Sequence, residues 1–594
     1  MATYEVCVDW NNDGDFVDVT EDITIDVKWL TYERGVEAEL ERAATGTLTL
    51  AVRNETGKYS PEYTGSVLSP NLLPGRPVRV RVVHDAVTYT VFTGYIEKIT
   101  PFPKEKTCEI FCTDGMDRLN RVPIEAPRRG AAAGIIIGKG TATKVSGVAL
   151  TFAPGPPPTI TRASGSFITD GYQPDMFVLV RAGPLGLDEL NVSVHKIASA
   201  ASSVTALVLT LTSNSVLAAE AATDPTLEQF GILIGILDEA GWPETKRSLD
   251  AGVDTLDLWW AHREKALDAI AKLMQAERSL AYVKGDGTFV YEDRHHRLKT
   301  GLGGAADHIA SQGTFSNTMT EMEYEFSART VRNIAQVTGH KRAAAALPAT
   351  VLWGTRDTPR IEPNKALTIW AHLEQPATAI VSPVGGTDYG ISATAAGVDS
   401  AALRANVAAV FTVYGQSVKM TFTSTNTQDV YIVNGSAPGT PAMSLIIRGQ
   451  EYEDDEVFAK EEDAASQVAY GDRAIEIDNP FMGNFNSLQA YAEWLVSRYK
   501  NPQPDALQMH LLNSTSALWT QILAREISDR ITLTVTDLGV SAKDYYINKM
   551  HHEMSEGGSI HKATWWLERV DETKYWLLEI AGYGELEQTT KVGF

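Results

Sequence analysis

The residues best arranged for chemistry are four oxygen-bearing side chains near the N-terminus, namely Asp9, Asn11, Asp13 and Asp15. Carboxylate and amide oxygens at alternate positions, with Gly14 allowing a sharp turn, are typical of the first half of a calcium-binding loop. Thr20 stands where such a loop has its bidentate Glu, and Glu21 follows one residue later. The sequence therefore predicts either a Ca²⁺ site or, more simply, an Asx-rich hairpin turn after the first strand.

A second cluster consists of His551, His552 and Glu553, and it nearly matches the helical motif of zinc proteases. That motif needs a second His one helical turn further on, but Glu556 stands there, and the segment reads as a strand. His561 lies across the expected hairpin, so a cross-strand metal pair is the alternative that remains open. A buried or hydrogen-bonded histidine is the simpler interpretation.

Two further patterns resemble a metal-binding cysteine pair and a phosphate-binding loop, but the spacing of their residues does not fit either site. Cys108 and Cys112 lie on one predicted strand, where four residues span about 13 Å, so the two thiols cannot share an ion. The glycines of residues 134–140 imitate a phosphate loop, but their spacing is one residue short and the Ser or Thr that would hold magnesium is missing. With no catalytic motif in the chain, we expect a protein of assembly or binding rather than an enzyme.

The elements that must position these residues are mainly strands. Six short runs rich in β-branched and aromatic residues fill the first 120 residues and predict a small barrel or sandwich. The acidic run 451–456 reads as a solvated linker, and a closing hairpin is expected around residues 556–558. Apolar periodicity and stop signals predict helices over 227–241, 259–277, 461–470, 487–500 and 517–525.

Charge and hydropathy exclude several classes of protein. The 594 residues carry 52 basic and 75 acidic side chains, which give a net charge of −23. A protein that binds nucleic acid through its phosphates needs a positive charge, so stable nucleic-acid binding is not expected. A negatively charged surface past which DNA slides without binding remains compatible with this charge. No apolar run reaches the roughly 18 residues of a membrane span. The first residues lack the pattern of a secretory signal, so we expect folding in a cytoplasm.

Several segments in fixed order point to a known family. They are Val8–Phe16, Ala44–Leu50, Asn54–Pro61, Asn71–Val78, Phe92–Ile96, Ile236–Pro243, Gly285–Phe289, Tyr470–Arg473, Asp478–Phe481, Ala492–Lys500 and the closing hairpin. This series resembles the baseplate hub, or tail-tip hub, proteins of long-tailed bacteriophages. It covers about two thirds of the chain and omits residues 128–226, which read as an inserted β module.

The resemblance implies a mainly β, multidomain α+β fold, with two small hub barrels, inserted β modules and a few amphipathic helices. The expected segments are 1–125 (first hub barrel), 126–226 (inserted β module), 227–320 (helical connector), 321–345 (start of the second barrel), 346–455 (inserted β-sandwich) and 456–594 (completion of the second barrel).

In function, the resemblance implies a homotrimer at the virion tail tip that closes the hexameric tail tube and forms part of the DNA exit channel. Its expected partners are the tail tube or distal tail protein and the tip, fibre or central spike proteins. No cofactor other than Ca²⁺ is expected. The surfaces that bind the tube are not identified, although loops 54–60 and 65–75 are the candidates.

Two other functions stay open. The first is a tail adhesin that binds a host glycan through the 346–450 sandwich, because Trp353, Trp370 and Tyr389 there could stack on sugars. The second is a cell-wall hydrolase, which no motif supports. The sequence does not identify the host, the receptor or the tail type.

Overall fold

The computed structural model describes most of residues 3–570. The segments outside the description are 37–43, 125–133, 136–144, 175, 182–193, 199, 212–216, 218, 223–224, 251, 253–254, 257–260, 295, 299–310, 345–349, 375–379, 382, 414–415, 436–442, 450–451, 503 and the two termini. The predicted glycine loop 134–140 and the pair Trp259 and Trp260 fall largely or wholly in these segments. No helix among the described residues is long and apolar enough to cross a membrane.

The N-terminal domain is a curled antiparallel sheet of six strands. Its order is β1 (Thr3–Val8), β4 (Pro77–His84), β5 (Val87–Phe102), β6 (Thr107–Thr113), β3 (Thr47–Arg53) and β2 (Val27–Gly35). In β4 and β6 every second residue is buried, as expected for strands with one face on a core. Cys108 and Cys112 are buried in β6 within that core and form no disulfide.

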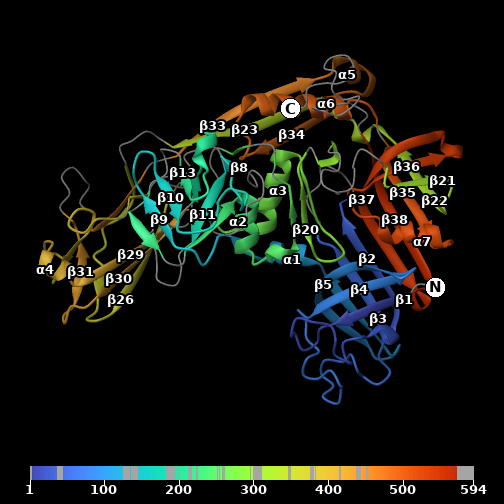
Figure 1. The fold of residues 1–594 in the computed structure, drawn as a ribbon, viewed down its shortest axis with the longest axis horizontal. Helices are drawn as coiled ribbons and strands as arrows, with labels where there is room; N and C mark the ends of the chain where they lie inside the picture. The colour runs from blue at the N-terminus through green and yellow to red at the C-terminus, as the bar shows by residue number, and fades with distance from the viewer. Residues whose placement is uncertain are drawn as a thin grey trace.

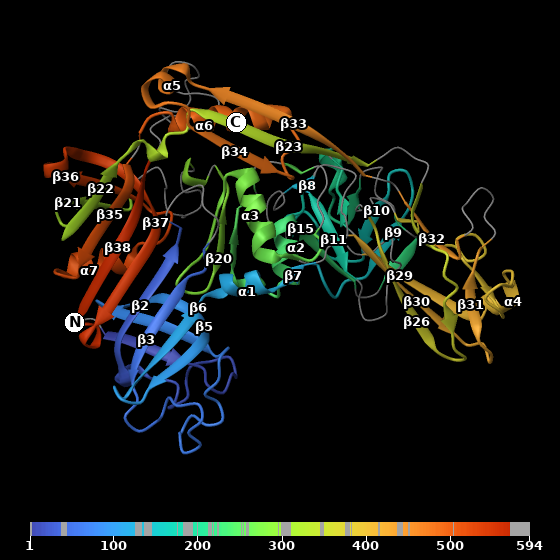
Figure 2. The same cartoon turned by 180° about the vertical axis from the view of Figure 1, so that it is seen from behind.

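A β-ladder between distant parts of the chain joins this domain to the C-terminal strands. β2 pairs antiparallel with β37 (Val540–Ser555), from Trp29 opposite Ser555 to Gly35 opposite Lys549. We call this β2–β37 ladder the seam; Figures 1 and 2 show both strands side by side. The sheet continues through β38 (Ile560–Arg569), β35 (Pro504–Leu512) and β22 (Glu321–Phe326), while β36 (Arg530–Val535) pairs with β37 and with β21 (Gly313–Ser316). The predicted closing hairpin, β37–β38, is confirmed.

One helix packs against both halves of this sheet. α7 (Ser516–Ala524) matches the predicted helix at 517–525, and its N-cap is Thr515, whose side chain accepts a hydrogen bond from the backbone N–H of Leu518. Leu518 and Ile522 enter the C-terminal core, whereas Trp519 and Leu523 pack on the N-terminal core. The helix therefore contributes to both cores at once.

The middle of the molecule contains most of the helices. α1 (Gly115–Arg121), α2 (Ile232–Glu239), α3 (Ala266–Glu277) and α6 (Phe485–Tyr499) share one core with the sheet of β16 (Arg247–Leu249), β20 (Phe289–Glu292) and β19 (Leu280–Val283). β18 (Glu264–Lys265) pairs with β7 (Pro123–Ile124), and β17 (Thr255–Leu256) with β8 (Gly134–Ile135).

Two of the predicted helices begin later than expected. The prediction of one helix over 227–241 is wrong at its start, because β15 (Thr226–Phe230) pairs with β11 (Phe177–Arg181) and Gly231 separates β15 from α2. The predicted helix 259–277 begins only at Ala266, since Arg263 has a positive φ of 51° and the next two residues form β18. In both cases a tertiary strand pairing overrides an apolar run that looks helical.

A long β-ribbon packs part of its length on the core that contains α6, through Ala335, Val337, Ala459 and Ile477. β33 (Tyr452–Glu462) pairs along its whole length with β23 (Ile334–Ala344), and β34 (Ala474–Asn479) pairs with the first half of β23. β23 thus lies in a three-stranded sheet of its own, outside the twelve-stranded sheet of the C-terminal strands. The acidic run is also not a linker but part of β33, where Asp455 lies opposite Lys341, and opposite charges across a ladder stabilise it. α5 (Ala464–Tyr470) follows.

Two β-rich domains occupy the centre and the far end. The first has its own apolar core and holds β9 (Leu150–Ala153), β10 (Thr159–Arg162), β11 (Phe177–Arg181), β12 (Val194–Lys196), β13 (Val208–Thr210), β14 (Glu220–Ala222) and β15. The second lies at the end of the long axis opposite the C-terminal strands (Figures 1 and 2). It holds β24 (Thr350–Thr355), β25 (Arg360–Ile361), β26 (Ala366–His372), β27 (Ile380–Val381), β28 (Gly390–Ser392), α4 (Ala401–Arg404), β29 (Val407–Val413), β30 (Ser417–Ser424), β31 (Val430–Val433) and β32 (Leu445–Gly449). The chain is mainly β and multidomain, as predicted.

Candidate functional sites: the seam and the N-terminal loops

Two long loops leave the N-terminal sheet at the same end. β1 ends where β4 begins, and β2 begins where β3 ends, so the β1–β2 and β3–β4 loops emerge together. The side chains of Lys58 and Tyr59 on one loop donate to Asp26 at the base of the other, at 2.7 and 2.6 Å. The two loops are therefore held together, and Figure 1 shows them projecting away from the rest of the molecule.

These loops carry exposed apolar side chains that the cores do not use. Trp10, Tyr59, Leu68 and Leu72 anchor the loops in the N-terminal core. The side chains we call the loop apolar set stay in solvent, with exposed fractions of 80 % for Val17, 96 % for Val19, 81 % for Ile25, 72 % for Val67 and 49 % for Leu73. Exposed apolar side chains gathered on neighbouring loops are a feature of surfaces that bind another protein.

The four oxygen-bearing residues predicted from the sequence do not all converge. The side chains of Asn11, Asp13 and Asp15 each accept a hydrogen bond from the backbone N–H group two residues further on, as in Asx turns. Asp9 and Asp13 also come together with Glu21, and one carboxylate oxygen of each lies within 4.8 Å of the others. Glu21 falls one place beyond the usual ligand position, so the spacing of a calcium loop does not include it.

The three carboxylates differ in burial. Asp9 and Glu21 are buried, whereas Asp13 is exposed. Both oxygens of Asp9 accept backbone N–H groups, from Asp13 at 3.2 Å and Gly14 at 3.0 Å. Burial raises the pKa of Glu21, and the neighbouring carboxylates of Asp18, Asp9 and Asp13 raise it further. The fold thus holds acidic groups close together at a cost that a bound cation would relieve.

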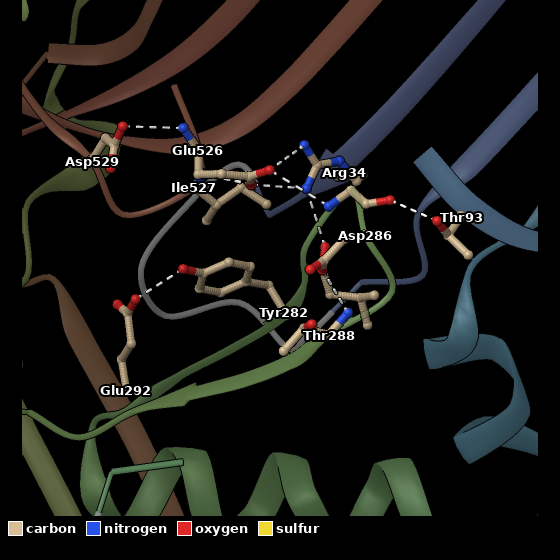
Figure 3. A network of polar contacts seen from close by, with 11 residues as sticks. Arg34, Thr93, Tyr282, Asp286, Thr288, Glu292, Glu526, Ile527 and Asp529 are labelled. Atoms are coloured by element: carbon tan, nitrogen blue, oxygen red, sulfur yellow. Dashed lines mark hydrogen bonds and ion pairs between the residues drawn. The ribbon is translucent and has the colours of Figure 1, made fainter. Parts of the chain in front are cut away.

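A buried ion pair lies beside the seam. The Arg34 guanidinium at the end of β2 donates to both carboxylate oxygens of Glu526, at 2.8 and 3.0 Å, and to the backbone oxygen of Val283 at 3.2 Å (Figure 3). The Arg34 side chain is only 4 % exposed and that of Glu526 28 %. One guanidinium therefore links the N-terminal sheet, the C-terminal segment and the β19–β20 hairpin.

The tip of the β19–β20 hairpin inserts between the two β-domains. The backbone N–H of Gly285 lies 3.5 Å from a Glu526 carboxylate oxygen, and its carbonyl accepts the Thr93 hydroxyl at 2.9 Å (Figure 3). A Cβ at this position would lie 2.3 Å from the backbone oxygen of Thr90. Only glycine lets the backbones approach so closely, which explains the glycine in the Gly285–Phe289 segment.

The histidines of the closing hairpin form a buried pair. His552 Nδ1 and His561 Nε2 share a hydrogen bond of 2.8 Å, and the His552 ring stacks on Tyr32 of β2 with centroids 4.6 Å apart. Burial lowers the pKa of His561 to about 3 and that of His552 well below its usual value. The ring nitrogens that face each other are thus occupied by one hydrogen bond, and the pair packs the seam in its neutral form.

The aromatic residues considered for glycan binding have different positions. Tyr389 is buried in the core of the far β-domain, and Trp353 is half-buried against that core. Trp370 on β26 is 52 % exposed, and the ammonium group of Lys419 on β30 lies 5.8 Å from its ring centroid. Trp370 is therefore the most exposed of the three candidates.

Among the comparisons with known proteins, only solved structures show a similarity to this chain. No protein-family model and no curated protein matches the chain. Among solved structures, it is similar to a 43 kDa tail protein of prophage MuSo2 from Shewanella oneidensis, at 9 % identity and a TM-score of 0.41, over 96 % of this chain and 98 % of that one. It is also similar to a tail protein from Neisseria meningitidis, at 9 % identity and a TM-score of 0.40, over 96 % of each chain.

A third similar structure is an E. coli component of the type VI secretion system, itself described as similar to the T4 tail proteins gp27 and gp5. The identity is 8 % and the TM-score 0.33, over 92 % of this chain and 74 % of that one. Two of these three solved structures are described as tail proteins, and the third as similar to tail proteins.

Proposed function

We propose that this chain is a structural, non-enzymatic subunit of the hub that closes the end of a phage tail tube. The observation that supports the proposal most strongly is the seam. It joins an N-terminal and a C-terminal β-domain edge to edge in a single twelve-stranded sheet. One chain therefore carries two β-domains side by side, fixed by backbone hydrogen bonds as well as by side chains.

A symmetry argument connects this geometry to the role. Three chains around an axis would offer six β-domains to a six-fold tube, and a closed ring of identical contacts is the common way in which such assemblies form. The domain of residues 350–449 lies far from the seam, at the opposite end of the long axis, and would decorate the outside (Figure 1). The net charge of −23 suits a channel through which DNA passes without sticking.

In this arrangement the two N-terminal loops are the surface that binds the tube or the distal tail protein. They contain the loop apolar set. Val67 and Leu73 of this set lie in the loop 65–75, one of the two candidate tube-binding loops in the sequence. Tip, fibre or spike proteins would bind the opposite side. Assembly would take place in the host cytoplasm, and the mature position would be the virion tail tip.

The direct test is co-assembly with the tail tube protein encoded by the same phage. The full chain and that protein, mixed after separate purification, should form a complex that contains three copies of the 64.7 kDa chain, as measured by native mass spectrometry. The double variant Val17→Asp/Val19→Asp should lose the complex and keep its thermal unfolding midpoint. Val398→Asp, which changes an 85 % exposed valine of the far β-domain, is the matched control. Loss of assembly by the control alone would contradict the assignment of the surface.

A glycan-binding role of the far β-domain is the second candidate, and it rests on Trp370. A half-exposed indole next to a lysine is a suitable platform for the apolar face of a sugar. A glycan-array screen of the full chain should then give hits that Trp370→Ala abolishes. An array without hits for the unaltered chain would remove this candidate.

A further inference from the structure

We infer that Asp9, Asp13 and Glu21 form a Ca²⁺ site that fixes the β1–β2 loop. The cluster differs from the alternate-position set that the sequence suggests, since the Asp15 carboxylate lies outside it and Glu21 joins Asp9 and Asp13. The site involves only the N-terminal domain, so a test of Ca²⁺ binding is independent of the proposed role in a tail.

The distances fit one calcium ion. Ca²⁺ binds carboxylate oxygens at about 2.4 Å, so two ligands of the same ion lie at most about 4.8 Å apart. The three carboxylate oxygens lie within 4.8 Å of one another. Calcium accepts six to eight oxygen ligands in flexible geometry, so water molecules would complete the shell.

An unsatisfied buried oxygen indicates that the site is built for a ligand. Glu21 is 1 % exposed, and its Oε2 accepts the backbone N–H of Asp18 at 3.0 Å, whereas its Oε1 has no hydrogen-bond partner among the described residues. A buried carboxylate oxygen without a partner is costly, and a cation is the partner that a carboxylate needs most. Among the described residues, no Lys or Arg forms an ion pair with the three carboxylates, and Lys58 of the neighbouring loop pairs with Asp26 instead.

The ligands are held by backbone contacts rather than by the loop alone. The backbone N–H of Asp9 donates to Pro77 at the start of β4, at 3.0 Å, and the carbonyl of Glu21 accepts the N–H of Val8 at 2.9 Å. Both buried ligands are therefore fixed to the sheet, and Asp13 closes over them from the loop. Because Val17 and Val19 lie between Asp13 and Glu21, the ion would fix the segment that exposes them.

Calcium binding by the full chain, first stripped with EDTA, tests the inference. Isothermal titration with CaCl₂ should show one saturable site, and Tb³⁺ should give luminescence sensitised by Trp10, which Ca²⁺ then quenches by displacement. Glu21→Gln and Asp13→Asn should each weaken Ca²⁺ binding at least tenfold. Asp15→Asn, an equally acidic neighbour outside the cluster, should change the affinity by less than twofold.

A folding control separates loss of the site from loss of structure. Glu21→Gln keeps an acceptor for the Asp18 N–H and removes a buried charge, so its thermal midpoint in EDTA should be equal to or higher than that of the unaltered chain, while the Ca²⁺-induced shift disappears. No saturable binding by the unaltered chain at about 10 mM Ca²⁺, well above the range of weak protein sites, would overturn the inference. Unchanged binding in Glu21→Gln, or an equal loss in Asp15→Asn, would overturn this ligand set.

Discussion

Replacement of Arg34 by Met keeps the length of the side chain and removes the charge that links the two β-domains. Breaking a buried ion pair from one side costs about 3–5 kcal/mol, because the remaining charge loses its partner. Glu526 is 28 % exposed and can regain some hydration, so we expect about 2–4 kcal/mol here. The loss falls on the seam, because Arg34 connects β2 to Glu526 and to the β19–β20 hairpin.

Amide hydrogen exchange of the β2 and β37 backbone measures this effect where it occurs. Each 1.4 kcal/mol of opening free energy is a factor of ten in exchange, so Arg34→Met should speed exchange in the seam roughly 30- to 700-fold. The double variant Arg34→Met/Glu526→Gln should recover much of the loss, because it leaves no unpaired charge.

A matched control exists elsewhere in the chain. Arg162 pairs with Asp170 in the first inserted β-domain, and the exposed fractions of the two side chains, 6 % and 26 %, are close to those of Arg34 and Glu526. Arg162→Met should therefore loosen its own domain and leave the seam unchanged. The reasoning is refuted if Arg34→Met changes seam exchange less than threefold, or if Arg162→Met changes it equally.

Three further predictions concern the same region. Gly285→Ala should loosen the contact between the β19–β20 hairpin and β5, since its Cβ would meet the backbone of Thr90, and should speed amide exchange in β5. Gly155→Ala, whose Cβ has its nearest neighbour at 3.9 Å, should leave that exchange unchanged. Burial raises the pKa of the Asp114 carboxyl to about 7. The folded protein therefore loses stability as pH rises from about 4 to 7, because the carboxyl ionises more readily in the unfolded chain. Asp114→Asn should raise the thermal midpoint more at pH 8 than at pH 4. Burial lowers the pKa of His561, so stability is lost as pH falls below about 6.5, and His561→Gln should reduce the drop in thermal midpoint between pH 7 and pH 5.

Much of the local structure could be predicted from the sequence. The strict alternation in β4, the apolar periodicity of α6 and α7 and the turn glycines of the closing hairpin are local signals, and each gives an element near its expected position. The errors arise where a distant partner decides the local structure. β15 looks helical until β11 pairs with it, and the acidic segment of β33 looks like a linker until β23 lies opposite.

The candidate sites were less accessible to sequence reasoning for the same reason. The seam joins residues more than 500 positions apart, and the ion pair of Arg34 and Glu526 spans 492. No local spacing carries such information. The acidic loop can be recognised from the sequence because its residues are near neighbours. Glu21 joins Asp9 and Asp13 through a tertiary contact, since the backbone of Val8 pairs with that of Glu21.

Gold-labelled antibody raised against this chain, applied to negatively stained particles of the phage that encodes it, tests the central claim most directly. The proposed role predicts label at the end of the tail tube in intact particles, and its loss from particles assembled with the Val17→Asp/Val19→Asp variant. Label along the tube or on the head, or none on intact particles while the soluble protein is present in the lysate, would contradict a hub at the tail tip.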